Sequence, residues 1–184
     1  MTSYVALLRG INVGGHRLIK MADLKGMFAA MDFDAVQTYI QSGNVVFRAA
    51  EPEQSLRQRI EQRIEATFGF PVTVALRTAD ELARLIADCP FAPDALTDGE
   101  RLHVALLADA PSPGGVERLL ARKTEPDECR VLGREVYLLY RQEMRLTQLS
   151  NNLIESLLGV PATARNWRTI TTLAAMSNAL SAGA

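Results

Sequence analysis

The residues best suited to bind a ligand lie in the segment Arg9-Gly10-Ile11-Asn12-Val13-Gly14-Gly15. Glycines let backbone N–H groups approach a ligand closely, and a guanidinium group pairs with two oxygens of a phosphate or carboxylate at once. A helical pattern begins near Met21, and a helix N-terminus favours negative charge. We therefore expect Arg9, Asn12, Gly14 and Gly15 to bind an anion. The alternative is a glycine-rich loop that only shapes a turn.

Two nucleotide-binding fingerprints are absent from this segment. It lacks the GK[ST] ending of a P-loop and the spacing of GxGxxG. The anion is therefore not assigned to a mononucleotide or dinucleotide.

A second polar cluster, Arg165-Asn166-Trp167-Arg168-Thr169, opens the last helical pattern. In a functional interpretation, Arg165 and Asn166 face a ligand and complete the pocket that the glycine loop begins. In the structural alternative, Trp167 packs in the core and Asn166 caps the helix.

The turn between two predicted strands, Gln41-Ser42-Gly43-Asn44, offers a hydroxyl and an amide. Asn beside Gly is typical of tight turns, because Asn tolerates left-handed backbone angles. We expect this turn at the end of the sheet opposite the glycine loop, and we assign neither Ser42 nor Asn44 a catalytic role.

Histidine and cysteine give no pattern typical of a metal site or a nucleophilic dyad. His16 and His103 lack i,i+4 partners, and Cys89 and Cys129 lack CxxC spacing. We therefore expect no metal and no other cofactor, and no general base stands out. Whether the protein is an enzyme stays open.

Composition limits the partners. The formal net charge is −1, which argues against nucleic acid because phosphate neutralisation needs a basic face. No stretch is long and apolar enough for a membrane span or a signal peptide, so we expect a cytoplasmic protein without a membrane partner. The oligomeric state stays open.

The order of elements predicts the fold class. In residues 1–76 a strand, a helix, a hairpin, a second helix and a strand follow one another, which is the βαββαβ order of a ferredoxin-like fold. After the Pro-, Asp- and Gly-containing connection 89–100, a strand, a helix, a hairpin and a helix follow again. We predict an α+β protein of two tandem ferredoxin-like units with antiparallel sheets, 1–88 with a trailing helix and 89–184 with an added C-terminal helix.

Three segments carry a resemblance to a known family: LLRGINVGG at 7–15, YIQSGNVVF at 39–47 and TARNWRTITTL at 163–173. The chain resembles the domain-of-unknown-function 1697 family of bacterial proteins over nearly its whole length. The resemblance implies a duplicated ferredoxin-like arrangement and no established activity. Cys89 and the stretch 141–152 depart from the pattern of the family.

Three function classes remain. The first is a binding module for a small phosphorylated or carboxylated ligand at the glycine loop, and it is the one we favour. The second is an acylphosphatase-like hydrolase, which rests on fold analogy. The third is a protein-partner-binding module without small-molecule chemistry, and an exposed apolar patch would favour it.

Overall fold

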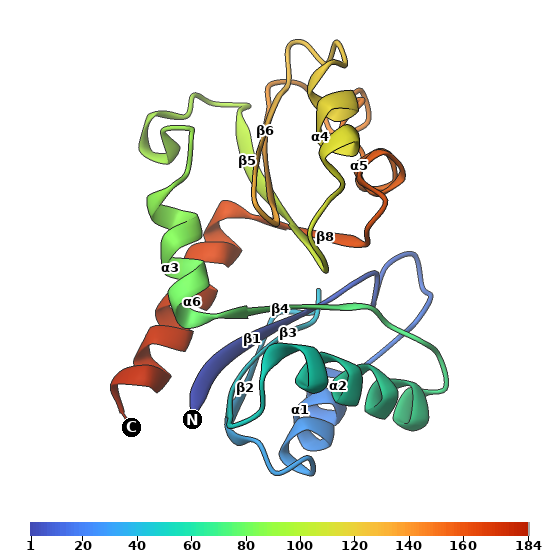
Figure 1. Cartoon of the computed structure of the whole chain (residues 1–184), viewed down its shortest axis with the longest axis vertical. Helices are drawn as coiled ribbons and strands as arrows, with labels where there is room; N and C mark the ends of the chain where they lie inside the picture. The colour runs from blue at the N-terminus through green and yellow to red at the C-terminus, as the bar shows by residue number, and fades with distance from the viewer. Residues whose placement is uncertain (184) are drawn as a thin grey trace. The chain divides into compact units, whose positions relative to one another are not determined.

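A computed structural model describes residues 1–183 of the 184-residue chain (Figure 1). The described residues form a mixed α+β fold with two four-stranded antiparallel sheets and six α-helices, which confirms the predicted α+β class with antiparallel sheets. Contacts between residues divide the chain into two units, of which Leu85–Ile170 is the second and the rest of the chain the first. No helix in the described residues is long and apolar enough to cross a membrane.

In the first unit, two helices lie on one face of the sheet (Figure 1). Alternate residues of the first strand, Tyr4, Ala6 and Leu8, face the helices and pack with Phe28 and Ile60. The strand order is β2-β3-β1-β4. The elements are β1 (Thr2–Leu8), α1 (Met21–Ala29), β2 (Asp34–Tyr39), β3 (Asn44–Ala49), α2 (Glu53–Phe68) and β4 (Val74–Thr78).

The second unit has the corresponding strand order, β6-β7-β5-β8, and its helices α4 and α5 again pack on one face of the sheet. Helix α3 (Ala79–Ala87) leads into it, followed by a short 3₁₀ turn at Pro93–Ala95. Its elements are β5 (Arg101–Leu107), α4 (Pro113–Leu120), β6 (Glu128–Leu132), β7 (Glu135–Tyr140), α5 (Asn151–Leu158) and β8 (Ala162–Asn166), and helix α6 (Trp167–Ala182) follows β8.

Each unit also contains a hydrogen bond that has a counterpart at the corresponding position of the other unit. In the first, Glu61 Oε1 on α2 accepts the N–H of Val74 at the start of β4, at 2.8 Å. In the second, Glu155 Oε1 on α5 accepts the N–H of Ala162 at the start of β8, also at 2.8 Å. A carboxylate on the second helix of each unit thus holds the first residue of its last strand.

The ends of these last strands correspond as well. Arg77 on β4 and Arg165 on β8 are both buried, and each donates to the carbonyl of the preceding residue. The next residue caps a helix in both units: Thr78 Oγ1 accepts the N–H of Glu81, and Asn166 Oδ1 accepts that of Thr169. The arginine is the same in both units, whereas the capping residue differs in type, Thr78 in the first and Asn166 in the second.

The contacts assign most of the C-terminal helix α6 to a different unit from the one predicted from the sequence. Sequence reasoning groups all of it with 89–184, whereas the contacts group residues from Thr171 onward with the first unit. One of these contacts is a hydrogen bond from Ser181 Oγ to Ser3 Oγ in β1, at 2.9 Å.

Candidate functional site

The two glycines of the loop after β1 form the tip of a small hairpin. Gly14 and Gly15 have φ of +60° and +75°, and the N–H of His16 donates to the Val13 carbonyl at 3.1 Å. Two successive residues with positive φ are typical of a type I′ turn, which glycine adopts without strain. Gly14 and Gly15 therefore shape this loop.

Asn12 holds the base of the same loop. Its Nδ2 donates to the carbonyls of Ile19 at 3.0 Å and Gln41 at 2.8 Å, and its Oδ1 accepts the N–H of Ile19 at 2.8 Å. Its φ of +55° lies in the left-handed region that Asn tolerates better than most residues. The amide of Asn12 is thus committed to joining the two ends of the loop and the turn between β2 and β3.

The turn between β2 and β3 lies at the same end of the sheet as the glycine loop, so the prediction of opposite ends was wrong. Both β1 and β2 are antiparallel to β3, so they run parallel and leave the sheet at one end. The N–H of Leu8 donates to the Gly43 carbonyl at 2.9 Å. Asn44 is buried and donates to the Tyr39 carbonyl and to Ser42 Oγ, as a turn former does.

A surface cavity of about 370 Å³ lies beside this loop, and Arg9 and Arg17 both line it. The N–H of Arg9 donates to the Thr73 carbonyl at 2.9 Å, which fixes the start of the loop against the segment that precedes β4. The other lining residues come from α2 and from that segment: Gln58, Glu61, Gln62, Glu65, Pro71, Val72 and Thr73. Asn12, Gly14 and Gly15 do not line the cavity.

The charges of the cavity are of two kinds. The carboxylate of Glu61 is already hydrogen-bonded within the protein, because its Oε1 accepts from Arg57 Nε at 3.1 Å as well as from the backbone N–H of Val74. The side chains of Arg17 and Glu65, by contrast, make no hydrogen bond or ion pair to any residue in 1–183. Sequence reasoning missed Arg17. Its signal is a cation two residues after Gly-Gly, where the hairpin turns the chain back.

Arg165 and Asn166, the second predicted cluster, lie at the junction between β8 and α6. The side chain of Arg165 is only 7% exposed and donates to Thr163 Oγ1 at 2.7 Å and to the Ala164 carbonyl at 2.9 Å. Burial lowers the pKa of Arg165 to about 10. Arg9 belongs to the first unit and Arg165 to the second, and their meeting in one pocket stays a prediction.

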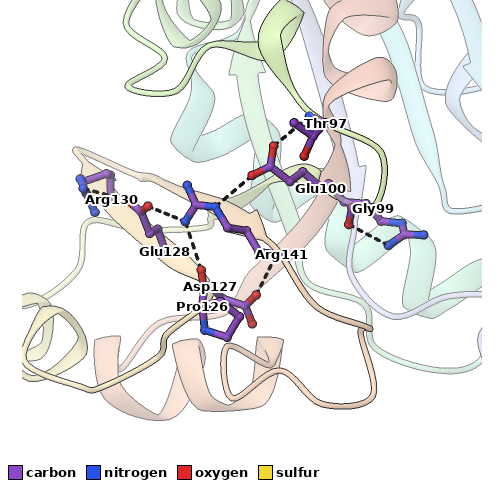
Figure 2. A network of polar contacts seen from close by, with 9 residues as sticks. Thr97, Gly99, Glu100, Pro126, Asp127, Glu128, Arg130 and Arg141 are labelled. Atoms are coloured by element: carbon purple, nitrogen blue, oxygen red, sulfur yellow. Dashed lines mark hydrogen bonds and ion pairs between the residues drawn. The ribbon is translucent and has the colours of Figure 1, made fainter.

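A polar network in the second unit surrounds Arg141 (Figure 2). Arg141 lies between two carboxylates, donating from Nε to Glu100 Oε1 at 3.0 Å and from Nη1 to Glu128 Oε1 and the Pro126 carbonyl. Glu100 also accepts the N–H of Thr97 at 2.9 Å. Because these groups satisfy one another, the network fastens the connection before β5 to the β6–β7 hairpin.

Asp127 organises the segment that follows β7. It is buried and accepts the N–H of Arg141 at 2.8 Å and the Nε2 of Gln142 at 2.7 Å. Burial by itself would raise the pKa of Asp127, but these hydrogen bonds and one from Thr147 hold the pKa below its usual value. Asp127 is thus a structural carboxylate and no candidate for acid–base chemistry.

The network predicts a loss of stability in acid. The backbone of Thr97 and the guanidinium of Arg141 lower the pKa of Glu100, and Arg141 lowers that of Glu128. Because these pKa values are lower in the folded protein, the unfolded chain takes up protons first as pH falls below about 4.5, and the free energy of unfolding decreases. Arg141→Gln is expected to flatten this decrease in urea titrations at several pH values.

A matched control is Arg145→Gln. It removes the ion pair with Glu143, whose side chains are 76% and 66% exposed and are therefore screened by solvent. The acid slope should stay as in the wild type. An Arg141→Gln variant with an unchanged slope would contradict the assignment.

We expect the buried side chain of His103 to cause a second change of stability with pH, at a higher pH than the first. Its Nδ1 is buried without a hydrogen-bond partner, and its ring contacts Tyr140 edge-on, with centroids 5.3 Å apart. Burial, and then the charge of Arg101, lower the pKa of His103. The unfolded chain therefore binds the proton first, and the free energy of unfolding should fall as pH drops below about 6.5.

His103→Gln should remove this part of the pH dependence, while His16→Gln, at the exposed tip of the glycine loop, should retain it. Thermal unfolding between pH 5 and 8 measures both. A His103→Gln profile that matches the wild type would show that another group titrates.

In the described residues, no group of three or more His, Cys, Asp and Glu side chains is placed to hold a metal ion. Cys89 and Cys129 are free, and burial raises the pKa of both thiols. Neither thiol is poised as a nucleophile.

Comparisons with known proteins agree with this architecture. Residues 1–137 match a family described as "Protein of unknown function (DUF1697)". The structure of the conserved bacterial protein SP0830 from Streptococcus pneumoniae is similar, with a TM-score of 0.71 and 20% sequence identity over 96% of this chain and 98% of that chain. At this identity the likeness shows the fold alone. No curated protein matches the chain.

Proposed function

The chain belongs to the family described as "Protein of unknown function (DUF1697)", and since that description names no activity, we propose from the site itself that the protein binds a small anionic ligand in the cavity beside the β1–α1 loop. The ligand is phosphorylated or carboxylated. Arg9 and Arg17 bind its anionic group, and Asn12, Gly14 and Gly15 hold the loop that presents Arg17.

One observation carries this proposal: two arginines of a single loop, Arg9 at its start and Arg17 near its end, line the same cavity. Two guanidinium groups in one cavity attract an anion and offer it several charge-assisted hydrogen bonds. The volume, about 370 Å³, is within the range of small-molecule sites.

At the end of the sheet where the first strand finishes, the two units differ most clearly in the length of the loop that follows this strand. Twelve residues, 9–20, join β1 to α1, whereas five residues, 108–112, join β5 to α4. The shared features, such as the buried Arg77 and Arg165, serve the fold in both units. A feature present in one unit alone is the better candidate for function.

Binding fits the cavity better than acyl phosphate hydrolysis does. The hydrolases of that kind position water with the side-chain amide of an asparagine, and the amides of Asn12 and Asn44 are committed to backbone carbonyls. No serine, cysteine or histidine lines the cavity.

We also propose that each unit is a ferredoxin-like fold, the arrangement that the order of elements predicts. The support is the βαββαβ order of both units and their corresponding strand orders, β2-β3-β1-β4 and β6-β7-β5-β8. A crystal structure whose units superpose strand by strand would test this directly.

A second candidate function, binding a protein partner, draws support from the outer face of the same loop. Val13 and Leu18 are 68% and 67% exposed, and Ile40 in the neighbouring turn is 47% exposed. A contiguous group of exposed apolar side chains is typical of a contact surface. If no anion binds the cavity, this surface becomes the better candidate.

The proposal is tested by thermal unfolding with inorganic phosphate and with sugar phosphates at constant ionic strength. A ligand at a hundred times its Kd should stabilise the wild type by about 2.7 kcal/mol. Arg17→Gln should weaken binding about tenfold, because it removes charge-assisted hydrogen bonds to the anion and no bond within the protein.

Arg63→Gln is the matched control, because it removes an exposed cation from α2 outside the cavity. It should bind like the wild type. Equal weakening in both variants would reveal nonspecific attraction, and the absence of any stabilising anion would reject the proposed function.

A further inference from the structure

We infer that the ligand of this cavity carries an ammonium group as well as an anionic group, an inference that rests on the proposed function. The cavity presents opposite charges from two elements, Arg17 on the loop after β1 and Glu65 on α2. Neither side chain pairs with the other or with any other residue in the described part of the chain.

The contrast with Glu61 makes Glu65 the informative residue. Glu61 also lines the cavity, but its carboxylate holds Arg57 and the backbone of Val74. Glu65 has no such structural task. A purely anionic ligand beside Arg17 would bring like charges together at Glu65, whereas a ligand ammonium would turn that repulsion into an ion pair.

The remaining lining residues favour a small polar ligand over a nucleotide. Gln58, Gln62 and Thr73 offer neutral hydrogen-bond donors and acceptors, which suit hydroxyl or amide groups. No aromatic side chain lines the cavity, so a nucleobase would find no ring on which to stack. The chemistry therefore points to a small zwitterion, an amino-alkyl phosphate or an amino acid.

Isothermal titration with matched probe pairs tests this inference. Aminoethyl phosphate and ethyl phosphate differ only in the ammonium group, and so do γ-aminobutyrate and butyrate. At neutral pH and constant ionic strength, we expect the amino member of at least one pair to bind about two- to fivefold more tightly, the range that a solvent-exposed ion pair supports. The pair that shows the effect identifies the anionic group as phosphate or carboxylate.

Glu65→Gln should abolish this advantage while leaving the affinity for ethyl phosphate or butyrate equal or higher. Glu117→Gln, which removes an exposed carboxylate from α4 in the second unit, should preserve the advantage. The inference is overturned if the members of each pair bind equally well, or if Glu65→Gln keeps the preference. If no probe binds at all, the proposed function falls together with it.

Discussion

Replacing Gly115 by alanine is expected to lower the free energy of unfolding by about 3 kcal/mol, because there is no space for a side chain. An added Cβ would lie 2.4 Å from the Leu157 carbonyl oxygen, 2.7 Å from Ser112 Oγ and 3.1 Å from Leu158 Cα. Two of these atoms belong to the backbone of α5, so the helices α4 and α5 would have to separate. Urea unfolding followed by circular dichroism measures the loss.

The neighbouring glycine is a matched control. A Cβ at Gly114 would meet only Arg118 Nη1 at 3.5 Å, an ordinary contact. Alanine is favoured over glycine within helices by about 0.5–1 kcal/mol, so Gly114→Ala should leave stability unchanged or raise it. Equal effects of the two substitutions would contradict the close packing of α4 on α5.

Asn12→Ala is expected to lower the free energy of unfolding by about 3 kcal/mol. About 2 kcal/mol of this comes from the hydrogen bonds to Ile19 and Gln41, at about 1 kcal/mol for a typical bond and less for the exposed one. The rest reflects the left-handed backbone at residue 12, with a φ of +55°, which alanine adopts at a cost of about 1 kcal/mol.

Asn12→Gly separates the two contributions, because glycine adopts positive φ without strain but makes no side-chain hydrogen bond. It should cost about 2 kcal/mol, and both variants should weaken phosphate binding because the loop no longer holds Arg17 beside the cavity. If glycine fully restores stability, the hydrogen bonds of Asn12 contribute little. If phosphate binding is unchanged in both variants, Asn12 does not position the site.

The sequence predicts best those elements that depend on residues close together in the chain, such as helices with a capping pattern. Thr78 with Glu81 three residues later is the pattern of a capping box, and both hydrogen bonds of that box form, at 2.8 and 3.2 Å. Strand β8 was missed, because Ala162–Asn166 contains no β-branched residue except Thr163 and no large apolar one. It is a strand because its backbone pairs with β5, which local propensity does not reveal.

The candidate site was only partly predictable. Residue type pointed to Arg9, which lines the cavity, and also to Gly14 and Gly15, whose positive φ serves a turn. The pairing of the glycine loop with α2 depends on the packing of the first unit. Because this packing is non-local, the place of Glu65 in the cavity could not be recognised from the spacing of residues in the sequence.

Backbone amide shifts in a titration of the ¹⁵N-labelled protein with inorganic phosphate test the central claim most directly. Binding in the cavity predicts saturable shifts at residues 9, 17, 58, 62 and 73, and the same titration of Arg17→Gln should require about tenfold more phosphate. Shifts centred away from the β1–α1 loop and α2, or no saturable shift at all, would contradict an anion site in this cavity.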